Sequence, residues 1–200
     1  GTEVDGVKVT WSAGDAINVN GTVSNALSEA GATGTFTFRK ELSTPYKAVF
    51  PADLYKDATT VTLPATWAVD DFDLPLYGYA ESGKDLPFKS LTALIKLSVT
   101  GESTTTLKEV TVKGLSEEQV SGDFSIDYTT GALAPLSDSE ASKEVKVNVG
   151  KTLSGEPVII YIPVPAGTYA SGYQIDLLDT EGGLMKNSVS ARTLKAGELR

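Results

Sequence analysis

The sequence predicts an all-β protein, and three of its features lead to that fold class. Apolar and polar residues alternate with a period of two in many short segments, as they do in half-buried β-strands. Clusters of Gly, Asp, Ser and Thr separate these segments. Helical spacing is scarce, and only the stretches 25–29, 51–55 and 137–143 could form a turn or two of helix. Many short strands divided by turns are typical of a β-sandwich or barrel.

The predicted strands follow one another along the whole chain. The first alternation contains Val7, Val9 and Trp11, and the second contains Ile17 and Val19. Each has one apolar and one polar face, so each predicts a strand that covers a core on one side. The later strands are centred on Phe36 and Phe38; on Tyr46, Ala48 and Phe50; on Ile95, Leu97 and Val99; on Val110 and Val112; on Phe124, Ile126 and Tyr128; on Val145, Val147 and Val149; and on Ile175 and Leu177.

The most hydrophobic run, VIIYIPV at 158–164, raises a question, because Pro163 lies inside it and Pro165 follows it. Proline has no N–H for a β-ladder, so it is confined to edge strands, strand ends and bulges. The run therefore predicts a strand that is protected against indiscriminate edge pairing, while Tyr161 and Ile162 can still join a sheet.

The segment AESGKDLP at 80–87 divides the chain near its middle. It is polar, contains Gly83 and Pro87, and precedes the regular strand segment LTALIKLSVT. A linker or a long crossing loop would have this composition. About six or seven strand candidates lie on each side, which is the number that a small two-sheet sandwich needs. We therefore predict two β-sandwich domains, at residues 1–84 and 85–200.

Composition excludes several classes of function. The 17 basic and 26 acidic residues give a net charge of -9, so no positive field attracts phosphate backbones or anionic lipid. We expect no nucleic-acid partner. The chain contains no cysteine, which excludes disulfides and zinc–thiolate sites, and no histidine, which excludes a Ser-His-Asp triad and histidine-ligated metals.

Carboxylate pairs are the acid–base machinery that remains, since a glycosidase needs only two acids across a cleft. Asp123 and Asp127 lie four residues apart in a predicted strand, so they share the face opposite Phe124 and Ile126. A solvated face is the preferred interpretation, because charged residues are seldom buried.

Asp176, Asp179 and Glu181 form a second acidic cluster, at the end of a predicted strand. Asp179, Glu181 and the two glycines at 182–183 have the composition of a hairpin turn, which is the preferred interpretation.

Asp70, Asp71 and Asp73 form the one acidic cluster dense enough to suggest a hard cation such as calcium. The cluster lacks the glycine and the distal glutamate of an EF-hand loop, so a polar loop is preferred. Gly83 and Lys84 lack the earlier glycine of a phosphate-binding loop. We therefore predict no catalytic, cofactor-binding or metal-binding residues, no cofactor, and a protein that is not an enzyme.

Trp67, Phe72, Tyr77 and Tyr79 are crowded into a stretch with little periodicity. Exposed aromatic faces could stack on sugar rings, so a surface glycan-binding module is the alternative function. The preferred interpretation is that these side chains cover the edge of the core and the domain interface.

The segment TWSAGDAINVN at 10–20 resembles the W-x-x-G-D-x-I-x-V signature near the start of the fimbrillin-like family, which are surface proteins of Gram-negative anaerobes. YKAVFPAD at 46–53 is similar to the family's Y-x-A-x-Y-P segment, with Phe50 in place of tyrosine. Similar segments continue in the family's order over nearly the whole chain: LPLYGYAE, LPFKSLTALIKLSVTG, LKEVTVKG, VSGDFSIDYTTG, YIPVPAGTYASGYQIDLLDTEGG and LKAGE.

This resemblance implies two tandem transthyretin-like β-sandwiches and a non-enzymatic fimbrial subunit or adhesin on the cell surface. It implies a lipoprotein precursor, anchored in the outer membrane only through its lipid, that loses an N-terminal segment by proteolysis after an arginine. It implies polymerisation when a donor strand from a neighbour fills the vacated groove. The partners implied are other fimbrial subunits, through β-strand addition, together with host or bacterial surface ligands.

The chain differs from the family pattern at both ends. Little sequence precedes Trp11, and Arg200 comes directly after LKAGEL, where the family continues into a final strand. We therefore expect an incompletely filled groove or an unpaired sheet edge near a terminus, which could accept an added strand.

Overall fold

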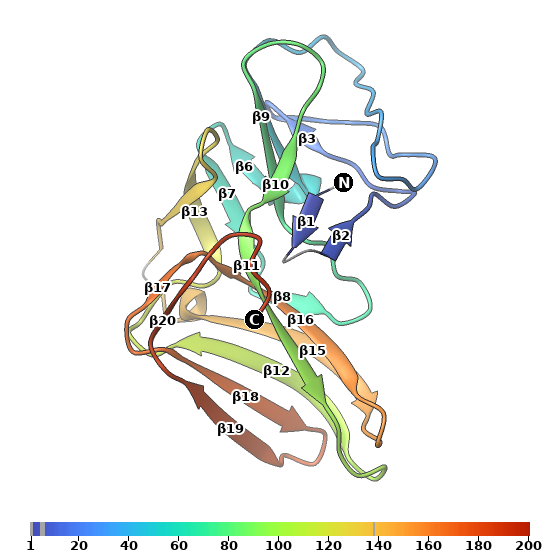
Figure 1. The fold of residues 1–200 in the computed structure, drawn as a ribbon. Coiled ribbons are helices and arrows are strands. Elements are labelled where there is room, and N and C mark those ends of the chain that lie inside the picture. The colour runs from blue at the N-terminus through green and yellow to red at the C-terminus, as the bar shows by residue number, and fades with distance from the viewer. Residues whose placement is uncertain (1, 5–6, 138) are drawn as a thin grey trace.

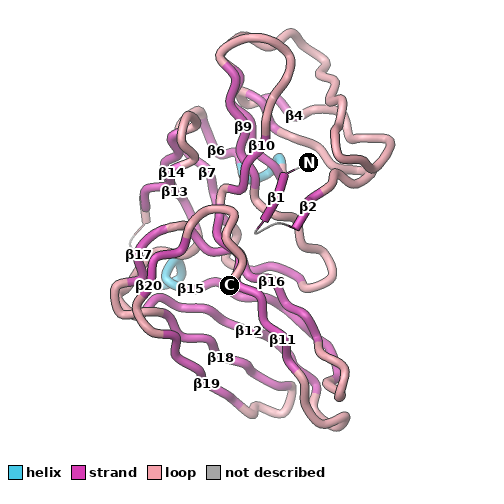
Figure 2. Tube along the Cα trace, viewed as in Figure 1, coloured by secondary structure: helices cyan, strands magenta, loops and turns pink. Residues whose placement is uncertain are grey.

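The computed structural model describes residues 2–4, 7–137 and 139–200, and it confirms the all-β prediction (Figure 2). The described residues contain two short 3-10 helices, η1 (Ala52–Leu54) and η2 (Glu140–Lys143), and otherwise strands and loops. Both helices lie in stretches where a helical turn was predicted, whereas the stretch 25–29 forms no helix. Neither helix is long and apolar enough to cross a membrane.

Two sheets build the lobe drawn at the top of Figure 1. The strand order of the first is β10 (Phe88–Ser90), β9 (Leu76–Ala80), β5 (Tyr46–Phe50), β3 (Asn18–Val19) and β4 (Thr22–Val23). The strand order of the second is β14 (Ala132–Pro135), β13 (Gly122–Asp127), β7 (Thr60–Leu63) and β6 (Tyr55–Asp57).

Strand β5 is buried on both faces, which explains its continuous apolar ending AVF. Val49 packs with Val61 and Phe124 in the core between the two sheets. Ala48 and Phe50 face the opposite side and join a second cluster. The first sheet therefore has a core on each face.

Trp11 organises this second cluster, which we call the Trp11 cluster. The indole makes edge-to-face contacts with Phe36, Phe50 and Phe88, at centroid separations of 5.0, 5.1 and 5.1 Å. Such aromatic pairs contribute about 0.5–1.5 kcal/mol each beyond the area that they bury. The tryptophan of the segment TWSAGD is thus a core residue.

The strand predicted around Phe36 and Phe38 is wrong as a strand. Both side chains are partly buried and alternate with exposed neighbours, but residues 32–45 form no β-ladder. The backbone of this segment is tied by a hydrogen bond from Asn25 N–H to Thr37 O (2.8 Å). An extended segment that packs two phenylalanines on a core has the same alternation as a paired strand.

The lower lobe of Figure 1 is a β-sandwich. One sheet has the order β19 (Leu184–Val189), β18 (Tyr173–Asp179), β12 (Thr106–Gly114), β15 (Glu144–Thr152) and β8 (Thr66–Ala68), with β8 parallel to β15. Facing it is the antiparallel ladder of β11 (Thr92–Val99) and β16 (Val158–Pro165). Val110, Val145 and Ile162 have no exposed surface in the core between them.

Two further antiparallel pairs complete the described strands. The pair β17 (Gly167–Tyr169) and β20 (Arg192–Leu194) contributes Tyr169 and Leu194 to the core of the lower lobe. The pair β1 (Thr2–Val4) and β2 (Val7–Val9) lies beside β10.

Strands from both sides of the predicted boundary at residues 84/85 share three sheets. β8 joins the sheet of the lower lobe, β10 pairs with β9, and β13 pairs with β7. The segment AESGKDLP is the loop of the β9–β10 hairpin, so it is not a linker. The division into residues 1–84 and 85–200 stays a prediction.

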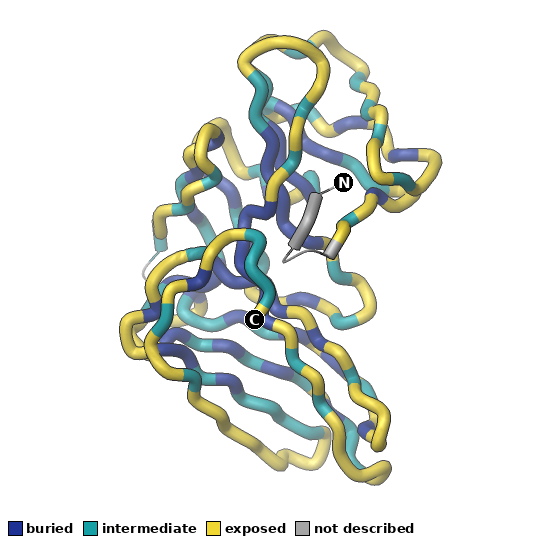
Figure 3. The backbone as a smooth tube through the Cα atoms, viewed as in Figure 1, coloured by how far each residue is buried: buried dark blue, intermediate teal, exposed yellow. Residues whose placement is uncertain are grey.

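The lobes share buried side chains at their junction, where Figure 3 shows buried segments running from one lobe to the other. Leu94 of β11 belongs to the Trp11 cluster, and Leu199 packs against it. Phe72 packs against the cores of both lobes. The junction is therefore apolar and continuous with both cores.

Candidate functional site

The hydrogen-bond pattern of β11 decides which backbone groups of the lower lobe face outward. β11 and β16 pair over eight residues, from Thr92↔Pro165 to Val99↔Val158. On its other side, Leu94 N–H donates to Glu198 O and Leu94 O accepts from Arg200 N–H, both at 2.9 Å. Successive strand residues direct their backbone groups to opposite neighbours, so the even-numbered residues of β11 face away from β16.

The two prolines of β16 occupy positions that face outward. Pro163 lies opposite Leu94 and Pro165 opposite Thr92, and both pairs are of the non-hydrogen-bonded kind. The missing N–H groups therefore remove no hydrogen bond from the ladder. They mean that no N–H lacks a partner on the side of β16 that faces away from β11, where both prolines are buried. β16 pairs only with β11 among the described strands, so it is an edge strand, as its prolines predicted.

An aromatic side chain covers the same edge. Phe72 lies between Trp67 of the core (centroids 5.7 Å apart) and Tyr161 on the outer face of β16 (6.1 Å, rings 26° apart). The segment that joins β8 to β9 thus passes alongside β16. Prolines and Phe72 together leave little room for another strand there.

In the upper lobe, a proline of β14 also occupies a position whose nitrogen faces away from the neighbouring strand. Leu136 N–H donates to Asp123 O (3.1 Å), so the neighbouring pair Phe124↔Pro135 makes no ladder bond. Pro135 therefore also directs its nitrogen to an outer edge.

The outer edge of β11 is only partly covered. The segment Gly197–Arg200, which we call the strap, runs parallel to β11, with Leu199 beside Leu94. Gly197 N–H donates to Thr92 O (2.9 Å) and Lys96 N–H donates to Arg200 O (2.5 Å), in addition to the two bonds of Leu94. The strap thus bonds to four outward backbone groups of β11: the C=O of Thr92, the N–H and C=O of Leu94, and the N–H of Lys96.

Beyond the strap, three backbone groups of β11 face outward without a partner among the described residues. They are the C=O of Lys96 and the N–H and C=O of Ser98, and we call them the acceptor edge. No proline lies in β11. That an edge near a terminus accepts an added strand stays a prediction.

Apolar side chains lie beside the acceptor edge. Leu97 and Val99 of β11 and Leu177 of β18 face the core of the lower lobe but are only partly buried. Met185 lies opposite Leu177 on the same face and is 66% exposed. The ladder of β11 and β16 has fewer strands than the sheet facing it, so this part of the sandwich interior is uncovered.

The other end of this interior is closed. Tyr173 is buried, and burial raises the pKa of its hydroxyl. The guanidinium of Arg192 lies 5.9 Å from the centre of the Tyr173 ring, and Arg200 forms an ion pair with Glu198.

The acidic residues considered for catalysis have structural partners. Asp123 pairs with Lys56 and accepts from the hydroxyl of Thr62 (2.6 Å), and both groups lower the pKa of its carboxyl. Asp127 accepts from Thr129 N–H (2.9 Å) in the turn after β13. Both carboxylates lie on the solvent side of β13, opposite the buried Phe124.

The second acidic cluster forms a hairpin turn, as predicted. Asp179 accepts from the N–H groups of Glu181 (2.8 Å) and Gly183 (2.7 Å) between β18 and β19. Asp176 lies 3.9 Å from Lys186 on the neighbouring strand. These carboxylates complete a turn and a cross-strand pair.

The three aspartates considered for calcium point to different partners. Asp70 forms an ion pair with Lys151 (2.6 Å). Asp73 is exposed, and partial desolvation of its carboxyl, followed by the charges of Asp15, Asp71 and Asp53, raises its pKa. No group of three acidic residues in the described part of the chain has a geometry that could hold a metal ion.

The four crowded aromatic residues do not form one surface. Trp67 is buried in the core of the lower lobe, and Tyr77 is buried between the two upper sheets, where its hydroxyl donates to Thr130 O (2.8 Å). Tyr79 and Phe72 are partly buried in different places. A stacking platform for sugar rings needs exposed faces side by side, which this arrangement lacks.

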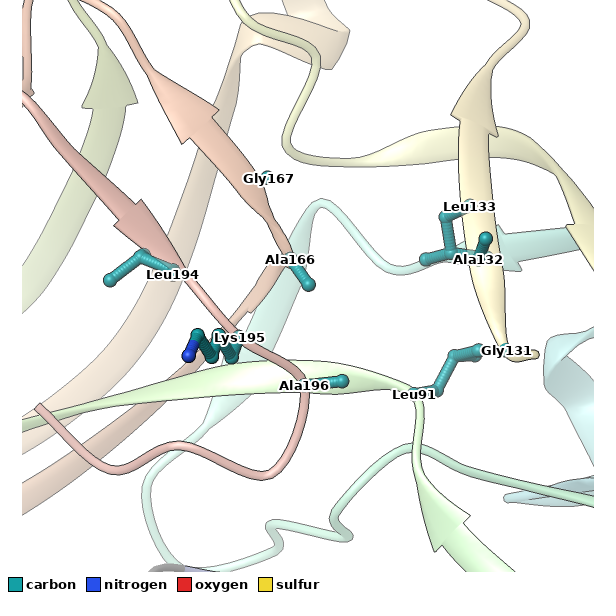
Figure 4. Close-up of a pocket in the computed structure, with 9 residues that line it drawn as sticks. All are labelled: Leu91, Gly131, Ala132, Leu133, Ala166, Gly167, Leu194, Lys195 and Ala196. Atoms are coloured by element: carbon teal, nitrogen blue, oxygen red, sulfur yellow. The ribbon is translucent and has the colours of Figure 1, made fainter.

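A shallow hollow of about 370 Å³ lies where the β13–β14 hairpin meets the antiparallel pair of β17 and β20 (Figure 4). Lys195 is the one charged residue in its lining. A small-molecule site needs several convergent polar groups, which this hollow lacks. Its lining consists of Leu91, Gly131, Ala132, Leu133, Ala166, Gly167, Leu194, Lys195 and Ala196.

No protein-family model and no curated protein sequence matches the chain. Solved structures are similar to it, among them the following two. A suggested cell adhesion protein from Bacteroides uniformis has 15% sequence identity and a TM-score of 0.62, over 98% of this chain and 88% of its own. A suggested cell adhesion protein from Bacteroides ovatus has 14% identity and a TM-score of 0.57, over 93% and 80%. At these identities the likeness shows the fold alone.

Sequence reasoning missed the residues of the acceptor edge. Lys96 and Ser98 are ordinary polar residues of an alternating strand, and nothing in their identity reveals which neighbour their backbone faces. Pro163 and Pro165 were the available signal, because two prolines at a spacing of two mark one edge of β16 as unpaired. Their position relative to Leu94 and Thr92 requires the register of β11.

Proposed function

We propose that this chain is a non-enzymatic adhesion protein of the cell surface, a fimbrial subunit or adhesin, and that β11 accepts a strand from a neighbouring subunit. The observation that carries the proposal is that β11 is an edge strand without proline, whose outward backbone groups already bond to an added segment, Gly197–Arg200. Strand addition uses this chemistry: main-chain hydrogen bonds supply affinity, and alternate side chains supply register.

The side chains around the acceptor edge support this proposal. An added strand beside Ser98 would place every second residue toward the uncovered interior, over Leu97, Leu177 and Met185. Covering apolar surface contributes about 25 cal/mol per Å². A strand with alternating apolar residues therefore matches the site better than a polar one.

The prolines of two other edges also support the proposal. Pro163 and Pro165 on β16 and Pro135 on β14 remove donors that would face away from the neighbouring strand, so pairing at those two edges is restricted. β11 contains no proline.

The finer parts of the proposal come from the resemblance to the fimbrillin-like family. They are the two transthyretin-like sandwiches, the lipid-anchored precursor, the location at the outer membrane or in a fimbrium, and other fimbrial subunits as partners. Both solved neighbours carry names that suggest cell adhesion, and both come from Bacteroides, which supports this choice. The glycan-binding alternative is not favoured, because Trp67 and Tyr77 are buried.

The test compares proline substitutions at two residues that face each other. Ser98 and Ile159 form a non-hydrogen-bonded pair, so Ser98 N–H faces the outer edge of β11 and Ile159 N–H the outer edge of β16. Ser98→Pro and Ile159→Pro therefore each remove one outward donor and no ladder bond. We expect Ser98→Pro to reduce surface filaments and cell–cell adherence of the producing bacterium, and Ile159→Pro to leave both unchanged.

Melting temperature and the amount of protein on the cell surface serve as controls for folding and export. Equal adherence in the wild type and Ser98→Pro, at equal surface amounts, contradicts strand addition at β11. An equal loss in both variants points instead to a general effect on the sandwich.

A further inference from the structure

We propose that Asn20 is a site of spontaneous deamidation, and that this modification releases the segment 32–45 from the Trp11 cluster. We call this segment the flap; it belongs to the blue loops of the upper lobe in Figure 1. The flap contributes Phe36, Phe38 and Leu42, all partly buried, to the cover of that cluster. Deamidation at Asn20 is independent of strand addition at β11.

Two asparagine residues supply every hydrogen bond that the flap makes among the described residues. Asn25 donates its N–H to Thr37 O and its side-chain amide to Thr37 Oγ1, both at 2.8 Å. The side-chain amide of Asn20 donates to Ser43 O (2.7 Å) and to Pro45 O (3.0 Å). Asn20 therefore fastens the end of the flap that leads into β5.

Asn20 is itself held against β5. Its side-chain Oδ1 accepts from Lys47 N–H (3.0 Å), and its own N–H donates to Lys47 O (3.0 Å). Asn20 and Gly21 form the two-residue turn between β3 and β4, with φ values of +52° and +79°. A turn of this kind favours the sequence Asn-Gly. Because the side-chain amide makes three hydrogen bonds, it is not free to rotate toward the backbone nitrogen of Gly21.

The same dipeptide is chemically reactive when the side chain is free. The backbone nitrogen of Gly21 attacks Cγ of Asn20, and the new N–C bond closes a succinimide ring. The bond from Cγ to the side-chain nitrogen breaks, and that nitrogen leaves as ammonia with the proton of the attacking N–H. Water then opens the ring to aspartate or isoaspartate. Glycine hinders the attack least because it has no Cβ. Gly21 is exposed, so water reaches the ring.

The product of this reaction cannot fasten the flap. A carboxylate accepts hydrogen bonds but donates none, and Ser43 O and Pro45 O are themselves acceptors. Isoaspartate would in addition lengthen the main chain within a two-residue turn. Lys47 N–H keeps an acceptor in an aspartate, so the contact between β3 and β5 can remain. The loss is therefore centred on the flap.

Opening of the flap has to precede the reaction. The flap is held by the hydrogen bonds of two asparagines and by side chains that are only partly buried. Segments with few buried contacts open locally at a low free energy, independently of global unfolding. Each opening frees the side chain of Asn20, and the loss of ammonia is irreversible. The modified fraction therefore grows with the time that the flap has spent open.

The rate of deamidation tests the protection of Asn20. The full chain and a synthetic peptide of residues 17–24 are incubated in the same alkaline buffer, and peptide mass spectrometry measures the modified fraction. We expect Asn20 to react at least about tenfold more slowly in the folded chain than in the peptide. Equal rates in the two would overturn the inference.

A second comparison tests the role of the flap in that protection. Phe38→Ala loosens the flap, so it should move the rate at Asn20 toward that of the peptide. Val189→Ala, at a partly buried residue of the lower lobe, is the matched control and should leave the rate unchanged. A rate at Asn20 that Phe38→Ala does not change, or that both variants raise equally, contradicts release through the flap.

Asn20→Asp tests the consequence of the modification directly. Trypsin should cleave after Arg39 or Lys40, both exposed in the flap, at least about fivefold faster than in the wild type, the change expected from losing one hydrogen bond. Asn187→Asp makes the same charge change at an exposed residue of β19 and should not alter cleavage. Unchanged cleavage in Asn20→Asp would show that Asn20 does not fasten the flap. Faster cleavage throughout the chain would show global unfolding, which also contradicts a local release.

Discussion

Pro163 of β16 lies directly opposite Leu94 of β11, in a pair that makes no hydrogen bond across the ladder. The backbone groups of Leu94 bond to the strap on one side of the two-strand ladder, and the nitrogen of Pro163 faces the other side. One edge of this ladder is therefore bonded to another segment, and the opposite edge has lost a donor.

This relationship predicts the effect of replacing Pro163 with alanine. Pro163→Ala restores an N–H that faces away from β11, but Pro163 is buried, so this donor has no partner and no access to water. A buried donor without a partner costs about 1–3 kcal/mol, so we expect a lower free energy of unfolding in urea titration. Pro157→Ala, in the exposed loop before β16, is the matched control and should leave that free energy nearly unchanged. Equal free energies in the two variants would show that the position of Pro163 tolerates an N–H.

Met185 and Leu184 predict which face of β19 takes part in assembly. Both side chains are exposed, at 66% and 53%, but Met185 shares the inward face with Leu177 and Leu184 faces the other way. Met185→Lys should reduce filament formation, because a charge would lie under the added strand, whereas Leu184→Lys should not. Both variants should keep the melting temperature of the wild type. A stronger loss in Leu184→Lys contradicts the placement of the added strand.

Replacing Tyr128 with phenylalanine should stabilise the fold. Its ring is buried between the two upper sheets, its hydroxyl has no hydrogen-bond partner among the described residues, and burial raises its pKa to about 12. A buried hydroxyl without a partner costs about 1–3 kcal/mol, so Tyr128→Phe should raise the free energy of unfolding by about 1 kcal/mol in urea titration. Tyr77→Phe is the control: it removes the bond to Thr130 O and should lower that free energy. Destabilisation by Tyr128→Phe would mean that the hydroxyl has a partner.

Replacing Asp73 with asparagine should change the stability of the fold by an amount that depends on pH. Partial desolvation of the exposed carboxyl, followed by the charges of Asp15, Asp71 and Asp53, raises its pKa above the ordinary 3.8. The folded state therefore binds the proton more tightly than the unfolded state, and the ionised carboxylate costs stability at neutral pH. Asp73→Asn should raise the melting temperature at pH 7. The gain should shrink as the pH falls through the raised pKa and disappear below the ordinary value.

The pKa of Asp127 is shifted in the opposite direction to that of Asp73, so replacing Asp127 serves as the control for replacing Asp73. Hydrogen bonds from the hydroxyl and N–H of Thr129 lower the pKa of its carboxyl. Its ionised form therefore stabilises the fold above the ordinary pKa, and this stability is lost as the pH falls through the lowered value. Asp127→Asn should lower the melting temperature at pH 7. A gain in both variants would show a general relief of net negative charge.

The sequence by itself determined the class of fold and much of the chemistry that the protein lacks. Alternation placed strands at residues such as Val145, Val147 and Val149, because a strand that covers a core must send every second side chain into it. The glycines and acidic residues after β18 predicted a hairpin turn, since turn geometry is local. The absence of histidine and cysteine excluded whole classes of catalytic site.

The tertiary structure alone decided the pairing of strands and the location of the unpaired edge. Phe36 and Phe38 show why, because their alternation records contact with a core and carries no information about a hydrogen-bonded neighbour. The acceptor edge depends on Lys96 and Ser98 being even-numbered members of a strand in register with both β16 and the strap. That register is set by contacts between residues about 65 to 105 positions apart in the chain, as the pairs Lys96↔Tyr161 and Leu94↔Leu199 show. Local propensity acts over a few residues, so it cannot encode which way a given N–H points.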